Sequence, residues 1–208
     1  MQVNRCARGP GRANRAGLDS GQARHVDAPL DRCYELKLAL AVSEEDNFDI
    51  YIIDFETRQI TWTCGIPDGQ GSANGLLNCP DDAHIRADGK FLTADIRNCR
   101  VLIIDPKDSR IVTPWGTPGE CRHDPPRLLG YPNGATPMDN GEILVCEIVD
   151  AKISRITRAG KVVWSVSAPK IRYPSDAFPT VDGKQVIVAD FFKPDRVVIF
   201  DPATRKIS

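Results

Sequence analysis

The 208-residue sequence predicts an all-β chain made of repeated four-stranded antiparallel units, and three observations lead to this prediction. First, a proline-led block recurs three times, and a glycine follows the proline by 9 positions each time, at 80 and 89, 132 and 141, and 174 and 183. Second, each glycine belongs to an Asp-Gly or Asn-Gly turn, which favours hairpins because such turns need positive φ. Third, the flanking segments are short, β-branched and apolar, as buried strands are.

The order of elements is the same in each unit. A first strand begins at the proline, the hairpin turn follows, and a second strand ends at an acidic residue, which is Asp95, Glu147 or Asp190. A third apolar strand comes next, then a polar turn such as 105–108, then a fourth strand such as 110–115. Four antiparallel strands in about 42 residues correspond to one blade of a β-propeller.

A partial unit precedes these three. Residues 49–54 match a third strand and 59–63 a fourth, while the alternating run 36–42 fits a second strand and could equally open a helix. At the other end, the last unit stops at Ser208, inside its expected fourth strand. The predicted blades are approximately 34–64, 80–116, 132–167 and 174–208.

About four blades, the outer two incomplete, suggest an open or incomplete ring, because propellers typically close with about 4 to 8 blades. A closed four-bladed ring is the alternative, and part of a six- or seven-bladed ring fits the missing strands better. An open arc would expose apolar blade faces and an unpaired strand edge. We therefore expect self-association through the open edges.

Composition limits the partners. The net charge of −1 gives no electrostatic reason to expect nucleic acid or an anionic membrane, and no run of 18 apolar residues predicts a membrane span. Residues 1–33 carry six Arg, no Lys and three Asp without apolar periodicity, which predicts a disordered extension or a mis-assigned start. This segment also lacks the apolar centre of a secretory signal.

The cysteines suggest one disulfide. Cys99 lies between the second and third strands of its blade, and Cys121 lies in the linker after the fourth strand, so both are expected on the same face. Their bond would close a loop of about 22 residues, contribute about 3 kcal/mol and imply an oxidising compartment. Two free thiols are the alternative. Cys64 and Cys79 flank a Gly-rich linker and are a second candidate pair.

Carboxylates at strand starts and ends form the candidate site. The first strands of a propeller line its central channel, so Asp82 and Asp176 are expected near one mouth, together with the acidic ends of the second strands. Such oxygen ligands suit Ca²⁺ or a small polar ligand. The competing interpretation is that these groups bond turn backbone, as their repetition in every blade would predict. The predicted ligand-binding residues are Asp82, His84, Asp95, Glu147, Asp176 and Asp190.

Three further features have weaker chemical signals. His84 follows Asp82 and could act with it as an acid or base, although a single His is more often packed or on the surface. Cys121 and His123, with Cys99 nearby, lack the paired spacing of a metal site. Trp62, Trp115 and Trp164 recur near the ends of fourth strands, which indicates packing between blades.

Two stretches of the chain resemble a known group of proteins. Residues 80–101 and 120–135, within a likeness that runs from about Ser43 to Ser208, resemble the bacterial propellers of the NHL-repeat and PQQ-like, six-bladed type. The resemblance implies the fold and, for many members, export, whereas no secretory signal is visible, so the compartment is left unknown. It does not imply PQQ binding, and no residue here argues for that cofactor.

The sequence thus leads to two functional hypotheses. The first is a non-enzymatic binding or scaffold module that holds an unknown protein or a small polar ligand through the face carrying the loops between second and third strands. The alternative is a propeller enzyme of the hydrolase, lactonase or dehydrogenase kind, with a metal or cofactor in the central channel. A carboxylate ring around a metal would favour the enzyme, and a channel with internal hydrogen bonds only would favour the binding module.

Overall fold

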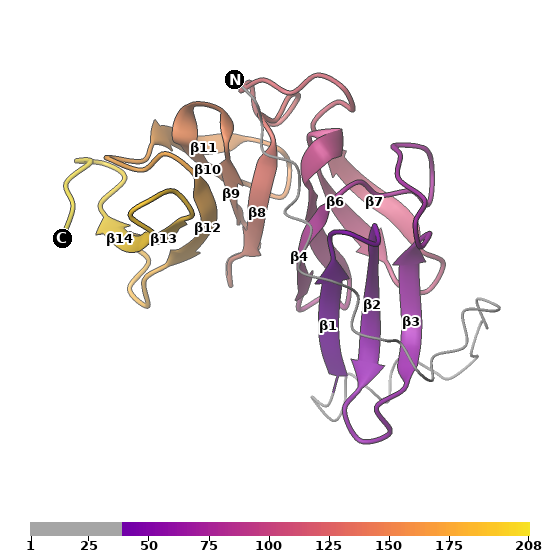
Figure 1. The fold of residues 1–208 in the computed structure, drawn as a ribbon. Helices are drawn as coiled ribbons and strands as arrows, with labels where there is room; N and C mark the ends of the chain where they lie inside the picture. The colour runs from indigo at the N-terminus through magenta and orange to yellow at the C-terminus, as the bar shows by residue number, and fades with distance from the viewer. Residues whose placement is uncertain (1–38) are drawn as a thin grey trace.

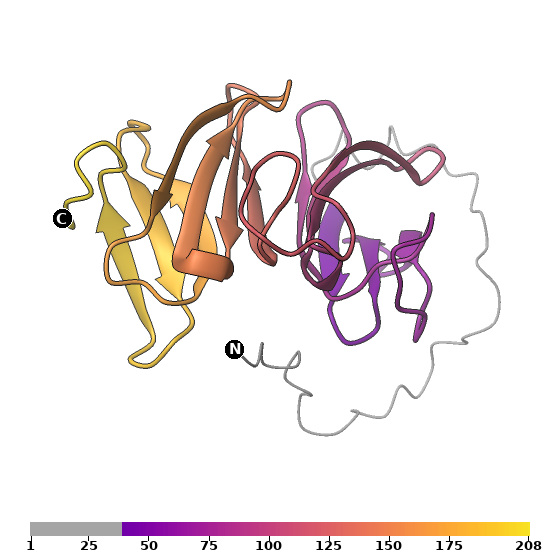
Figure 2. The same cartoon turned by 90° about the horizontal axis from the view of Figure 1, so that it is seen from above.

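The computed structural model describes residues 39–208, so the prediction for 1–33 lies outside the described part of the chain. Within it, fourteen strands form four antiparallel sheets, in each of which the strands are neighbours in chain order. Figures 1 and 2 show the four sheets side by side in an open arc, with no closed ring among the described residues. The all-β, propeller-blade prediction is therefore confirmed.

The strands of each sheet follow one another along the chain. The first sheet holds β1 (Ala39–Glu44), β2 (Asp49–Asp54) and β3 (Ile60–Gly65). The second holds β4 (Pro80–Ile85), β5 (Phe91–Asp95), β6 (Arg100–Asp105) and β7 (Arg110–Trp115). The third holds β8 (Pro132–Pro137), β9 (Ile143–Glu147), β10 (Lys152–Ile156) and β11 (Val162–Ser167). The fourth holds β12 (Pro174–Pro179), β13 (Val186–Asp190) and β14 (Arg196–Phe200). Short 3-10 turns at Ile96–Asn98 and Val149–Ala151 join second to third strands.

The glycine turns have the backbone that the sequence predicted. Gly89, Gly141 and Gly183 have φ of 75°, 82° and 68°, a region in which a side chain would be strained. In each case the glycine N–H donates to the carbonyl three residues earlier, as from Gly89 to Arg86 at 2.9 Å. The hairpins that set the register of the inner strands are therefore confirmed. The described part of the ambiguous run 36–42, from Ala39 onward, lies in the strand β1.

The apolar core is divided among the three boundaries between sheets. Alternate residues of each strand point to opposite faces, so each sheet contributes one face to the sheet before it and one to the sheet after it. Trp62 of β3 stacks on Phe91 of β5, with ring centroids 4.7 Å apart, which confirms its predicted packing between blades. The clusters centre on Ile52, Phe91 and Ile104, on Leu92, Ile103 and Ile143, and on Leu144, Val188 and Phe200.

The last sheet leaves one apolar face uncovered in the described structure. Phe178 of β12 is 42% exposed and Val197 of β14 is 67% exposed. These side chains share a face with Ile187 and Ile199. Phe178 is in register with Ile187, which is in turn in register with Ile199. In the second and third sheets the corresponding face packs against the next sheet, as Leu92 does. No helix in residues 39–208 is long and apolar enough to cross a membrane.

Candidate functional site

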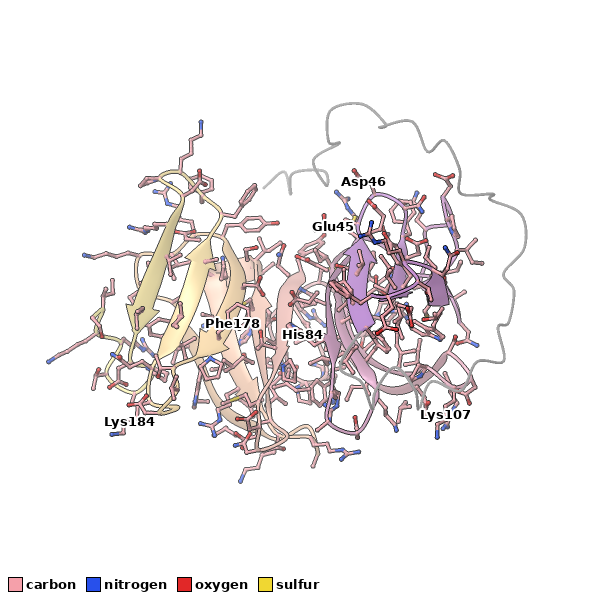
Figure 3. All side chains as sticks on the ribbon, turned by 90° about the horizontal axis from the view of Figure 1, so that it is seen from below. Glu45, Asp46, His84, Lys107, Phe178 and Lys184 are labelled. Carbon is pink, nitrogen blue, oxygen red and sulfur yellow. A yellow bond between two sulfur atoms is a disulfide. The ribbon has the colours of Figure 1, made fainter. Side chains whose placement is uncertain are left out.

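Polar side chains meet where the inner strands β4, β8 and β12 lie next to one another. We call this group the inner-strand cluster; its members are Asp81, Asp82, His84, Asn133, Tyr173 and Asp176. Each of the three strands has a register irregularity in this region, between Asp81 and His84 in β4, between Pro132 and Gly134 in β8, and between Pro174 and Asp176 in β12. Such bulges re-aim side chains. Figure 3 shows His84 in the middle of the molecule, between the sheets.

Asn133 is the centre of the hydrogen bonds in this cluster. Its amide nitrogen donates to Asp81 Oδ2 at 2.9 Å and to the backbone carbonyl of Ser175 at 3.3 Å. Its amide oxygen accepts from the Tyr173 hydroxyl at 3.0 Å. Because these partners come from the second and fourth blades, one side chain of the third blade joins all three.

Asp82 and Asp176 make the second half of the cluster. Asp82 accepts a hydrogen bond from the backbone N–H of Ala135 at 2.8 Å, and its Oδ2 lies 3.7 Å from Nε2 of His84. Asp176 packs so close to Gly134 that a Cβ at that position would lie 2.9 Å from Asp176 Oδ1. The glycine of β8 is therefore what admits the Asp176 carboxyl into the cluster.

Burial and mutual repulsion change the protonation of the cluster. Burial, followed by the Asp82 charge, raises the pKa of Asp81 to about 7. The same two causes raise the pKa of Asp176 to about 6. Interaction with Asp82 raises the pKa of His84. Burial and the neighbouring Asp82 therefore favour the protonated forms of Asp81, Asp176 and His84, or attract a positive charge from outside.

Two buried polar atoms of the cluster, Oδ1 of Asp176 and Nε2 of His84, make no hydrogen bond of normal length within the described chain. Nε2 of His84 nevertheless faces Asp82 Oδ2 at 3.7 Å, and the Asp176 carboxyl lies beside the same aspartate. A buried polar group without a hydrogen bond costs about 1–3 kcal/mol, so such atoms are uncommon in a structure that is otherwise well bonded. Oδ1 of Asp176 therefore lacks an N–H donor within the described chain.

The other three predicted carboxylates bind backbone. Each of them, Asp95, Glu147 or Asp190, ends the second strand of its blade. Each accepts a hydrogen bond from a backbone N–H in the linker, two positions before the inner strand of the same blade begins. The donors are Asn78 at 2.7 Å, Gly130 at 2.6 Å and Arg172 at 3.2 Å. We call these three carboxylates the anchors, because each fixes the linker to its blade.

Each anchor uses its second oxygen for a side chain. Asp95 Oδ2 accepts from Arg100 Nε at 2.7 Å, and Asp190 Oδ2 lies 3.4 Å from Arg196 Nε. These arginines begin the third strands of their blades. The third blade differs, because Glu147 Oε2 lies 2.8 Å from Nδ1 of His123, a residue of the linker before β8.

The six predicted ligand residues are thus divided by the structure. Asp82, His84 and Asp176 lie together in the inner-strand cluster, whereas the anchors Asp95, Glu147 and Asp190 lie apart in their own blades. Within residues 39–208, no three His, Cys, Asp or Glu side chains are grouped so as to hold a metal ion. Asp81, Asn133 and Tyr173 belong to the cluster but are not among the ligand residues predicted from the sequence. Asn133 and Asp81 follow the opening proline directly in their blades, and this shared position was the available signal.

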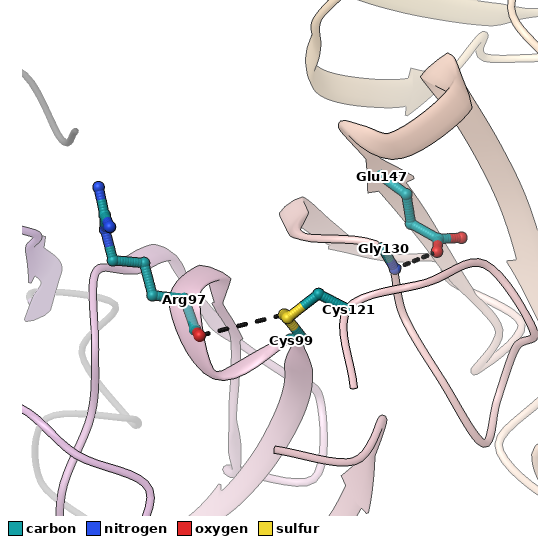
Figure 4. The surroundings of a disulfide bond; sticks show 5 residues. All are labelled: Arg97, Cys99, Cys121, Gly130 and Glu147. Carbon is teal, nitrogen blue, oxygen red and sulfur yellow. Dashed lines mark hydrogen bonds between the residues drawn. A yellow bond between two sulfur atoms is a disulfide. The ribbon is translucent and has the colours of Figure 1, made fainter. Parts of the chain in front are cut away.

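The predicted disulfide is present. Cys99 and Cys121 are bonded, with Cα atoms 5.2 Å apart and a sequence separation of 22 residues (Figure 4). It joins the short turn before β6 to the linker that precedes β8. Cys64 is a buried free thiol, so its suggested pairing with Cys79 is wrong. Cys146 is likewise free and buried, as expected for an apolar strand position.

No protein-family model matches the sequence, and no curated protein is similar to it. Among solved structures, hydrazine synthase of Kuenenia stuttgartiensis is similar, with 14% identity and a TM-score of 0.59 over 82% of this chain and 44% of that one. Virginiamycin B lyase of Staphylococcus aureus is similar with 15% identity and a TM-score of 0.57, over 82% of this chain and 50% of that one. The chain spans about half the length of these propellers or less, and at such low identity the likeness shows the fold alone.

Proposed function

We propose that residues 39–208 form a propeller-type binding module that holds a small cationic, polar ligand at the inner-strand cluster, within a chain of the NHL-repeat or PQQ-like type. The observation that carries the proposal is the buried Oδ1 of Asp176, which receives no N–H within the described chain and belongs to a carboxyl that lies beside Asp82. A ligand N–H placed there would supply the missing hydrogen bond, and charge-assisted bonds of this kind are stronger than neutral ones.

The charge of the cluster supports a cation rather than an anion. Asp81, Asp82 and Asp176 contribute three carboxyl groups, and Glu45 adds to the negative potential felt by Asp81. His84 is the only basic side chain among the six cluster residues. A bound ammonium group would relieve the repulsion between the carboxylates and release the protons that they otherwise retain.

Ligand binding can be tested by calorimetry and thermal unfolding with four probes: ethanolamine, putrescine, CaCl₂ and glycerol. An amine should bind and raise the Tm by mass action, whereas glycerol should not. Asp176→Asn should weaken amine binding at least tenfold, and Asp139→Asn, an exposed carboxylate, is the matched control. If only CaCl₂ bound, the ligand would be a metal ion; if no probe bound, or if D176N bound the amine as well as the parent, the proposal would be wrong.

Acid–base catalysis at the same cluster is the second candidate function. It is favoured by the raised pKa values of Asp81, about 7, and Asp176, about 6, because general acids and bases work best near the operating pH. The solved relative named a lyase shares only the fold. Turnover of a panel of lactones, esters and alcohols, lost in Asp176→Asn and His84→Gln but kept in Asp139→Asn, would favour this hydrolase, lactonase or dehydrogenase type.

A second copy of the chain is the proposed partner for the exposed face of the last sheet. Between consecutive sheets of the molecule, the corresponding face of one sheet is covered by the facing side of the next sheet. On the second sheet this covering side includes Phe91 and Ile104, which are in register. Leu40 and Ile53 are paired in the same way on β1 and β2, and Leu40 is 51% exposed. A head-to-tail contact between two copies would therefore repeat an interface that the chain already builds three times.

Oligomer mass measured by light scattering over a concentration series tests this contact. The parent should associate, and Val197→Asp should shift it to monomer because a charge would be buried in the contact. Val181→Asp, at the exposed tip of the hairpin before β13, is the matched control and should behave as the parent. A parent that stays monomeric throughout the series contradicts the head-to-tail contact.

A further inference from the structure

Three side chains of the third blade form a chain of hydrogen bonds that ends at a hydroxyl. Nε2 of His123 lies 3.1 Å from Oγ of Ser165, and Nδ1 of the same ring lies 2.8 Å from Oε2 of Glu147. Glu147 ends β9, Ser165 lies in β11, and His123 belongs to the linker between them and the second blade. From this geometry we infer that Ser165 is an activated nucleophile for acyl transfer, at a site separate from the inner-strand cluster.

The hydrogen bonds assign a role to each ring nitrogen. Glu147 accepts the Gly130 N–H with Oε1 and faces His123 with Oε2, so the carboxylate acts as an acceptor on both sides (Figure 4 shows the Gly130 bond). The ring must therefore donate from Nδ1. In the neutral ring Nε2 is then the acceptor, and it receives the Ser165 hydroxyl proton. An acid that orients the imidazole and an imidazole that takes a hydroxyl proton are the parts of a Ser-His-acid triad.

A second serine supports the nucleophile. Ser154 of β10 is in register with Ser165, and the two Oγ atoms lie 2.9 Å apart. Since Ser165 donates its proton to His123, Ser154 is the donor in this second bond. The bond holds the Ser165 hydroxyl in one direction, and donation to its oxygen would also stabilise negative charge that develops there.

The linker that carries His123 is fixed at several points. Two residues earlier, Cys121 is disulfide-bonded to Cys99. The N–H of Gly116 donates to the Pro126 carbonyl at 2.8 Å, which closes the linker into a loop. The His123 side chain is 19% exposed, whereas the Glu147 side chain is fully buried. The acid is thus the innermost member and the imidazole reaches the solvent, as proton transfer to a bound substrate requires.

The anchor role of Glu147 does not by itself account for this arrangement. In the other two complete anchors an arginine of the third strand, Arg100 or Arg196, occupies the place of His123. An arginine keeps its proton, so it can hold a carboxylate but cannot act as a base. Among the three anchors, only Glu147 contacts a side chain that can accept a proton, the His123 imidazole. The second nitrogen of that ring contacts the Ser165 hydroxyl.

The reaction that fits these groups is hydrolysis of a small ester. Ser165 Oγ would bond to the carbonyl carbon while its proton passes to His123 Nε2, and the departing alkoxide would leave with that proton as an alcohol. Water, deprotonated by the same imidazole, would then cleave the acyl-serine to the acid and restore the hydroxyl. β11 is the edge strand of its sheet, so N–H groups along its free side could donate to the oxyanion.

A fluorophosphonate probe followed by peptide mass spectrometry tests the inference, because it reports covalent reaction without a known substrate. The folded parent should gain one adduct, on Ser165. Ser165→Ala should abolish it. Ser167→Ala, at an exposed serine of the same strand, and Asp176→Asn should both keep it, which separates this site from the inner-strand cluster.

Three results would overturn the inference: no adduct on the folded parent, an adduct that persists in Ser165→Ala, or labelling that is equal on other exposed serines. His123→Gln should lose labelling by at least a hundredfold, and its Tm shows whether the loss reflects chemistry or unfolding. Release of p-nitrophenol from p-nitrophenyl acetate provides a second readout, which should disappear in Ser165→Ala and remain in Ser167→Ala.

Discussion

The amide of Asn133 and the carboxylate of Asp81 join two blades through a hydrogen bond of 2.9 Å. We predict that Asn133→Ala lowers the free energy of unfolding by about 1–3 kcal/mol, because it leaves Asp81 and the Tyr173 hydroxyl without their partner. Chemical denaturation measures the change. Asn74→Ala, an exposed amide in the linker after β3, should change stability by less than about 0.5 kcal/mol; equal losses in both variants would contradict the bridging role.

The stability of the inner-strand cluster should fall as the pH rises. The pKa of Asp81 is about 7 in the fold, compared with about 3.9 in an unfolded chain. Between these values the folded state binds more protons than the unfolded state, so the free energy of unfolding contributed by Asp81 decreases with increasing pH.

Denaturation of the parent and of Asp81→Asn at intervals from about pH 4 to about pH 7 measures this contribution. The variant cannot ionise, so its stability relative to the parent should increase across the interval. Asp139→Asn should show no such trend. A difference between variant and parent that stays constant with pH would mean that the folded carboxyl titrates normally.

The anchor of the second blade should contribute more than a surface ion pair. Asp95 is fully buried and accepts hydrogen bonds from Asn78, Asn98 and Arg100. Asp95→Ala would leave the buried Arg100 with two backbone carbonyls but without its carboxylate, and removing one member of such a buried ion pair costs about 3–5 kcal/mol. Glu56→Ala, at an exposed carboxylate, is the control for denaturation measurements. A cost for Asp95→Ala as small as that of the control would show that the linker does not depend on the anchor.

Loss of the disulfide should destabilise the chain measurably. The Cys99–Cys121 bond closes a loop with a separation of 22 residues, for which the chain-entropy relation gives about 3 kcal/mol. The double variant Cys99→Ser, Cys121→Ser should show this loss in chemical denaturation and should also react more slowly at Ser165, since the linker carrying His123 would be less fixed. An unchanged midpoint would mean that other contacts hold the linker.

The strands could be predicted because their signals are local. Positive φ at Gly89 and its equivalents, and β-branched segments on both sides, specify each hairpin within about a dozen residues, and repetition supplies the blade.

The separation of the anchors from Asp82 and Asp176 could not be predicted, because Asp82 and Asp95 are both acidic residues near strand ends. The two residues differ in their hydrogen-bond partners. Asp95 accepts from a backbone N–H and an arginine of its own blade, whereas Asp82 accepts from a backbone N–H of the neighbouring blade. The Glu147, His123 and Ser165 contacts were also hidden, since they span 24 and 42 positions and His123 lies in an irregular linker.

The division of the core among sheet boundaries has a consequence for synthesis. Each apolar cluster needs side chains from two consecutive blades, so a blade that has left the ribosome cannot complete its core until the next one emerges. The block starts are 52 and 42 residues apart, and translation at about 5–20 residues per second makes that wait several seconds. During each wait, the nascent chain exposes the apolar face of its last completed sheet. This face is then accessible to chaperones and to other nascent chains on the same messenger RNA.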